Sequence, residues 1–261
     1  MNARKHPHLS RISSMHFFKL VFRSLLLLAA MAVYIADKHK YTAPLYDDIS
    51  RHPILAGFIW VVFVLEMFLR FFPSNLESRG CQKQFARNYI PRPNAKPALQ
   101  SAATTASVAI AWFALNGAIG ALYFTGLIDK GILLLIALAY SVCDMICILF
   151  FCPFQTWFMK NRCCATCRIY NWDFAMMFTP LLFIPHFYTW SLLGIALALL
   201  IEWEYLLRRY PERFSESTNR CLSCANCPEK LCQHKKQLQR FLRRNREYLR
   251  LKGNSLFNKE K

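Results

Sequence analysis

The stretch at residues 131–151, GILLLIALAYSVCDMICILFF, decides the fold of this chain. Its only charged residue is Asp144, and the remainder is almost entirely apolar. About 20 mostly apolar residues are enough for a helix to cross the hydrocarbon core of a bilayer, whereas water-soluble domains hold few segments of this kind. The stretch therefore predicts a membrane-spanning helix.

Similar segments lie on both sides of it. Spans of ordinary length are predicted at about 17–36, 53–72 and 102–128. The last apolar stretch, 174–207, would be roughly 50 Å long as one helix, too long for a hydrocarbon core of about 30 Å. Because it contains Pro180 and Pro185, followed by the polar break HFYTW at 186–190, we expect two short helices, 173–187 and 190–207, joined by a tight turn.

The predicted fold class is thus an all-α polytopic membrane protein. It has six transmembrane helices, the last two a short Pro-containing hairpin, in a bundle over residues 1–207. Residues 208–261 form a cytoplasmic part with a Cys-rich knuckle and a basic amphipathic helix. The composition agrees, since 55% of the chain is hydrophobic and 18% charged, which excludes an intrinsically disordered chain.

The basic residues indicate an orientation. Of the 33 Lys and Arg residues, all but Lys38, Lys40, Arg51 and Lys130 lie on one predicted side of the membrane. Because cytoplasmic loops of membrane proteins are enriched in Lys and Arg, both termini are predicted to be cytoplasmic, with the protein in the cell (inner or plasma) membrane. Four spans plus a re-entrant hairpin would preserve this sidedness.

The cysteines concentrate on the same side. The tail reads Cys221-x2-Cys224-x2-Cys227-x4-Cys232, and an earlier loop reads Cys163-Cys164-x2-Cys167. Thiols in a reducing cytoplasm rarely form structural disulfides, and two-residue spacing lets two thiolates of one turn bind a single metal ion. The last helical hairpin would bring both loops to one place. We therefore predict a metal site with ligands from Cys163, Cys164, Cys167, Cys221, Cys224, Cys227 and Cys232.

The identity of the metal stays open between an iron–sulfur cluster and Zn²⁺. The tail run resembles the C-x2-C-x2-C-x3-C-P motif of bacterial ferredoxins, from which it departs by one residue in the last gap and by lacking Pro after Cys232. This resemblance covers only about a dozen residues and assigns no family. Free or lipidated thiols near the membrane are the alternative to a metal site, particularly for Cys152.

Polar residues inside the spans are further candidates. Cys143, Asp144 and Cys147 lie within one helical turn of each other and suggest an intramembrane site for a soft cation or a proton relay. The alternative is a hydrogen-bonded acid beside two small packing residues. Glu66 and Arg70, spaced four residues apart, predict an ion pair on the surface of one helix.

The tail predicts a membrane-bound helix over 233–252. Its basic residues surround one apolar stripe, a pattern typical of a helix lying on anionic lipid. A protein partner is the alternative. Because no nucleic-acid motif accompanies the net charge of +18, no nucleic-acid partner is expected.

Three functions follow from these features. The first is a membrane redox component that passes electrons from its cytoplasmic centre to a lipid-soluble carrier or to a membrane or cytosolic redox partner. The second is a zinc-stapled scaffold or assembly factor without catalysis. The third is a soft-metal transporter or sensor that uses Cys143, Asp144 and Cys147. Whether the protein is an enzyme stays open.

Overall fold

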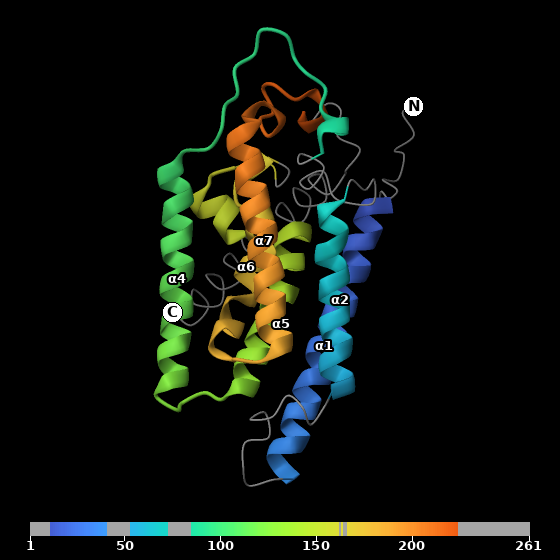
Figure 1. The fold of residues 1–261 in the computed structure, drawn as a ribbon, viewed down its shortest axis with the longest axis vertical. Helices are drawn as coiled ribbons and strands as arrows, with labels where there is room; N and C mark the ends of the chain where they lie inside the picture. Colours follow the sequence, from blue (N-terminus) through green and yellow to red (C-terminus); the bar gives the residue numbers. More distant parts are fainter. Residues whose placement is uncertain (1–10, 41–52, 73–84, 162, 164–165, 224–261) are drawn as a thin grey trace, which may run out of the picture.

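The computed structural model describes residues 11–40, 53–72, 85–161, 163 and 166–223. Within these ranges the regular secondary structure is helical, no strand is formed, and one isolated β-bridge joins Pro91 and Asn219. Five of the described helices are long and apolar enough to cross a membrane and run roughly along one axis (Figure 1). They are α1 (Arg11–Lys40), α2 (Pro53–Phe71), α4 (Ala102–Phe124), α5 (Lys130–Leu149) and α7 (Phe187–Arg209). The all-helical fold class is thus confirmed, with five candidate membrane-spanning helices among the described residues.

Short helical segments lie between these long helices and after α7. One α-helix, α6 (Asp173–Phe178), and one π-turn, η4 (Phe154–Phe158), lie between α5 and α7. The remainder are 3-10 turns: η3 (Ala86–Asn88), η6 (Tyr170–Trp172), η7 (Thr179–Phe183), η8 (Pro211–Arg213) and η9 (Arg220–Leu222). The predicted C-terminal helix at 233–252 lies outside the described residues.

Local side-chain caps set where the long helices begin. The Ser101 hydroxyl accepts a hydrogen bond from the Thr104 N–H before α4, and the Asp129 carboxylate accepts one from the Ile132 N–H before α5. Such caps satisfy backbone donors that a helix start leaves without partners. Gly126, at a φ of +77°, makes the turn between α4 and α5 in a conformation that favours glycine.

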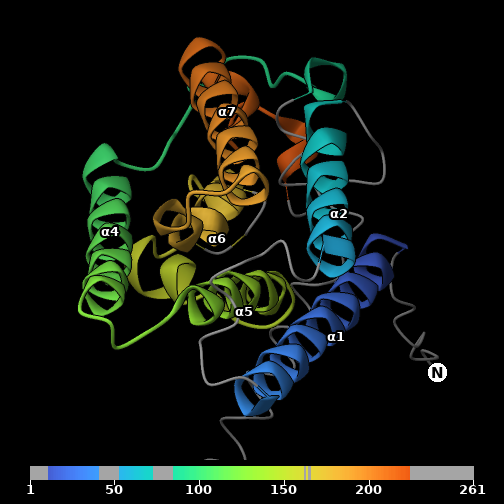
Figure 2. The same ribbon diagram turned by 60° about the horizontal axis from the view of Figure 1, so that its bottom comes forward.

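Helix α5 is the central element, and α1 packs along it in the antiparallel sense. The Tyr34 hydroxyl near the end of α1 donates to the Asp129 carboxylate at the start of α5, at 2.7 Å. At the opposite end, the rings of Phe17 and Phe150 meet edge to face at 6.0 Å. Figure 2 shows α1 and α2 on one side of the bundle and α4 on the other. The connection between α4 and α5 covers only residues 125–129, and α1 packs against α5 from the side that also carries α2.

The core and the outer surface are both apolar, as expected in a bilayer. Phe63 and Met67 of α2 belong to one buried cluster with Leu133 of α5 and residues of α6 and α7. Large side chains also point outward, with Phe18 of α1 68% exposed and Ile201 of α7 68% exposed. Because contiguous apolar surface of this kind is rare on soluble monomers, it marks the lipid-facing side of a membrane-embedded protein.

The predicted helix at 173–187 has a different form. The structure has six residues of α-helix in α6, then the 3-10 turn η7, and then extended backbone at Ile184. Pro180 lacks the N–H that an α-helix would use, which explains the change of helix type. No helix of spanning length forms here, so the count of six spanning helices is not confirmed. The segment nonetheless passes through the bundle, from Asp173 beside Arg70 to Phe183 beside Phe124.

Helix α4 packs through one narrow face. Its buried residues are Thr105, Val108, Asn116 and Gly120. A Cβ atom at Gly120 would collide with the ring of Phe183, whereas a Cβ atom at Gly117 would meet nothing within 4 Å. Close approach at Gly120 therefore sets how near α4 lies to η7.

Replacing Gly120 by Ala should destabilise the bundle. The added methyl group must displace the ring of Phe183, and overpacking of this kind costs about 1–3 kcal/mol. Thermal unfolding in detergent, followed by circular dichroism, measures the effect. Gly117→Ala is the matched control, because it adds the same methyl group to the same helix in open space. Equal stabilities for the two variants would contradict the packing described for α4.

Candidate functional site

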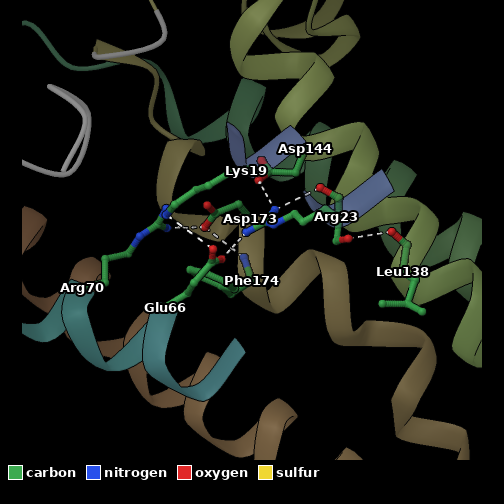
Figure 3. Close-up of polar contacts among 9 residues, drawn as sticks. Lys19, Arg23, Glu66, Arg70, Leu138, Asp144, Asp173 and Phe174 are labelled. Carbon is green, nitrogen blue, oxygen red and sulfur yellow. Dashed lines mark hydrogen bonds and ion pairs between the residues drawn. The ribbon is translucent and has the colours of Figure 1, made fainter. Parts of the chain in front are cut away.

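A buried ion-pair network joins three of the long helices. Arg23 of α1 places Nη2 at 2.5 Å from Glu66 of α2, and Nη1 at 3.2 Å from Asp144 and 3.0 Å from the Ser141 carbonyl of α5. Its side chain is only 3% exposed. Lys19, one turn earlier in α1, adds a second and more exposed cation at 3.5 Å from Glu66. Figure 3 shows these side chains converging from their helices.

A second buried pair extends the network to α6. Arg70 Nη1 donates to Asp173 Oδ1 at 2.6 Å, and the guanidinium of Arg70 lies over the ring of Phe174. Asp173 Oδ1 also accepts the N–H of Phe174 at 2.9 Å (Figure 3). The predicted roles of Glu66 and Arg70 therefore change, because each has a charged partner from another helix, which the spacing within α2 does not reveal.

The network is balanced in charge. It contains three cations and three carboxylates, and a guanidinium buried without a partner would be strongly unfavourable. The Nε of Arg23 has no hydrogen-bond partner among the described atoms, while both terminal nitrogens are paired. Asp144, predicted as part of a soft-cation site, pairs here with Arg23. The Asp144 carboxylate therefore pairs with the charge of Arg23 and holds α1 against α5.

The loop with the first cysteines is fastened to α7. Arg168 pairs with Glu204 at 2.5 Å, and Trp172 Nε1 donates to the same carboxylate at 2.9 Å. The Thr166 N–H donates to the Cys163 carbonyl at 3.3 Å, which closes a tight turn within the predicted knuckle. Glu204 thus holds the Cys163–Cys167 loop at the end of α7, which we call the cysteine end of the bundle.

The segment after α7 is anchored at the same end. The Arg220 N–H donates to the Ile90 carbonyl and the Arg92 N–H to the Thr218 carbonyl, both at 2.9 Å. The Ser215 hydroxyl accepts the N–H of Ala98 at 3.0 Å. These contacts tie residues 215–220 to the segment that precedes α4. Cys221, the first cysteine of the tail run, follows directly.

Arg213 is buried beside this anchored segment, with its guanidinium over the ring of Tyr210. Burial lowers the pKa of Arg213, and the neighbouring Glu212 raises it. An arginine nonetheless stays charged at neutral pH, so Arg213 is a fixed positive charge in the segment that leads to Cys221.

Two cavities meet at Cys167. The first, of about 270 Å³, has walls from the 161–168 loop, the end of α7 and residues 214–217. The second, of about 320 Å³, lies between α4, α5, η4 and α6 and is largely apolar. Cys167 lines both, and its side chain is buried. The loop with the first knuckle and the segment that leads to the tail knuckle therefore face one polar cavity.

The predicted ligands fall into two groups. Cys163, Cys167 and Cys221 belong to the described residues, and Cys164, Cys224, Cys227 and Cys232 lie outside them. Within the described part of the chain, no three His, Cys, Asp or Glu side chains are arranged to hold a metal ion. The predicted metal site therefore stays a prediction. Of the intramembrane candidates, Cys143 is exposed, and Cys147 lines the apolar cavity with Asp144.

Sequence reasoning missed the roles of Arg23, Asp173 and Glu204. For Arg23 the sequence contained one signal, because this arginine lies nine residues after the start of a candidate span at 14–36. Charged residues inside spans usually face the bundle interior.

The comparisons add no relative: the chain matches no protein-family model, no curated protein and no solved structure. Function must therefore be argued from the site itself.

Arg23→Met should destabilise the fold by about 3–5 kcal/mol. The change leaves the carboxylates of Glu66 and Asp144 in the bundle without their main cation, and breaking a buried pair costs this much. Unfolding by denaturing detergent measures the loss. Lys19→Met is the control, and we expect a change of less than about 1 kcal/mol because Lys19 is partly exposed. Similar losses for both variants would refute a special role for Arg23.

Glu204→Gln should loosen the first cysteine loop. A neutral amide makes weaker hydrogen bonds to Arg168 and Trp172 by about 1 kcal/mol, so maleimide labelling of the buried Cys167 should accelerate roughly 5-fold. Mass spectrometry of the labelled peptide gives the rate. Glu202→Gln is the matched control, because Glu202 Oε2 has no hydrogen-bond partner among the described atoms. Unchanged labelling in Glu204→Gln would show that the clamp does not hold the loop.

Proposed function

We propose that this protein is a membrane electron-transfer component with a thiolate-ligated metal centre at the cysteine end of its bundle. The ligands come from the two cysteine loops: Cys163, Cys164, Cys167, Cys221, Cys224, Cys227 and Cys232. The centre is an iron–sulfur cluster, for which clustered thiolates are the usual ligands. Seven cysteines exceed the four that a single tetrahedral zinc ion needs.

One observation carries the electron-transfer role. Cys167 lines both the polar cavity between the cysteine loops and the apolar cavity between α4, α5 and α6. A centre that includes Cys167 would therefore lie between a polar cavity and an apolar cavity. Such a position suits electron transfer between a water-soluble partner and a lipid-soluble carrier.

Charge supports the proposed orientation. The excess of Lys and Arg on the side of the cysteine loops supports a cytoplasmic position for the cysteine end, with the protein in the cell (inner or plasma) membrane. The thiols would then be in a reducing compartment. The basic tail helix at 233–252 would lie on anionic lipid beside the centre, which would keep the tail knuckle close to the membrane.

A zinc-stapled scaffold is the second candidate. The segment after α7 contains only the three-residue turns η8 and η9 as far as Ser223 and packs few large apolar side chains. A structural metal ion contributes folding free energy to segments of this kind. In this case the centre would fasten the tail to the bundle and transfer no electrons.

Metal analysis of the full-length protein, purified without oxygen, distinguishes the two functions. We expect iron and sulfide at cluster stoichiometry, with the visible absorbance of an iron–sulfur cluster, bleached by dithionite. Cys167→Ser and Cys221→Ser should each lose at least half of the iron. Cys143→Ser is the matched control and should retain it, because Cys143 lies outside both loops.

The opposite outcomes are equally specific. Stoichiometric zinc in a colourless protein, with unfolding of the tail in Cys221→Ser, would refute electron transfer and support the scaffold. Protein that binds neither metal under these conditions would refute both candidates.

A further inference from the structure

Sulfur atoms concentrate around the apolar cavity. Six of the residues that line it carry sulfur: Cys143, Cys147, Cys152, Cys167, Met176 and Met177. They come from α5, from the turn after it, from the first cysteine loop and from α6. Thiolates and thioethers are the ligands that soft metal ions prefer, and copper(I) is the main biological example.

Two of these thiols are already in contact. Cys147 near the end of α5 is hydrogen-bonded to Cys152, five residues later. The contact arises because α5 ends at Leu149 and the chain turns back before Pro153, which cannot continue a hydrogen-bonded helix. The turn brings Cys152 to the end of α5, against the helical turn that holds Cys147.

The backbone also contacts one of the two thiols. The Gln155 N–H donates to Cys152 Sγ at 3.4 Å. Hydrogen bonds from backbone N–H groups stabilise an ionised acceptor more than a neutral one. This N–H would therefore stabilise a metal-bound Cys152 thiolate.

We propose that Cys147 and Cys152 bind one copper(I) ion at the wall of this cavity. Two thiolates are enough for a linear copper(I) site, so no further ligand is needed. Each thiol loses its proton to solvent on binding, two protons for each copper ion, and no electron is transferred. The product carries a single negative charge, which an apolar cavity tolerates better than the higher charge of a four-thiolate site.

The site differs from the soft-cation site expected from the sequence. Asp144 pairs with Arg23, and its hard carboxylate oxygen is a poor ligand for copper(I). Cys143 lines the same cavity one turn before Cys147, whereas the hydrogen bond of Cys147 is with Cys152. Because its ligands lie outside the two cysteine loops, this proposal does not rest on the electron-transfer function.

Copper(I) binding to the full-length protein in detergent tests the proposal. The titration is done without oxygen, on fully reduced protein, against a chromophoric copper(I) chelator. The cysteine loops are unchanged in all variants, so a difference in copper binding between variants reports on the pair. We expect Cys147→Ser and Cys152→Ser each to bind one equivalent less than the wild-type protein. The control Cys143→Ser should bind as much as the wild type, and equal binding by all four proteins would overturn the proposal.

Alkylation of the wild-type protein, quantified for each peptide, tests the site without relying on variants that could fail to fold. In the wild-type protein, one equivalent of copper(I) beyond the loops should slow labelling of Cys147 and Cys152 by at least 10-fold and leave Cys143 unchanged. The same protection should persist in Cys221→Ser, which separates this site from the loop centre. Labelling of Cys147 and Cys152 that copper(I) does not slow, or a disulfide between them in the reduced preparation, would refute the proposal.

Discussion

A guanidinium removed from water must find charged partners, and Arg23 imposes this requirement on three helices at once. Its two terminal nitrogens contact Glu66 of α2, and Asp144 and the Ser141 carbonyl of α5. Each contact fixes how deep a helix lies relative to α1 and which of its faces turns toward α1. Apolar contacts by themselves allow small shifts in both. Burial of such a network adds little stability over well-packed apolar residues, but it disfavours every arrangement that leaves the arginine without partners.

The same constraint extends to the cysteine end. Arg70 of α2 binds Asp173, the first residue of α6, and so sets where the chain re-enters the bundle after the first cysteine loop. Glu204 of α7 adds a second ion pair through Arg168, five residues before Asp173. Both ion pairs therefore hold the loop on the C-terminal side of its cysteines. Geometry at Cys163 and Cys167 depends on charged residues that are distant in sequence and bind no metal themselves.

The two proposed centres occupy different environments. The cysteine loops border a cavity with many polar side chains, whereas Cys147 and Cys152 line an apolar cavity within the bundle. A polar, hydrated setting suits a centre that must exchange electrons with a soluble partner. An apolar wall of thiols and thioethers suits a soft ion of low charge. Cys167 lines both cavities.

The sequence by itself determined the membrane-spanning helices, because apolarity over about 20 residues is a local property and needs no knowledge of neighbours. It also determined the helix starts at Ser101 and Asp129, whose caps act within three residues. It did not foresee the 3-10 form of η7, where Pro180 removes a backbone donor inside a buried segment. Only the tertiary structure decided the partner of Arg23, which is 121 residues from Asp144, and the pairing of Arg70 with Asp173. Such pairs depend on which helix faces are brought together, and that choice is made by the packing of the whole bundle.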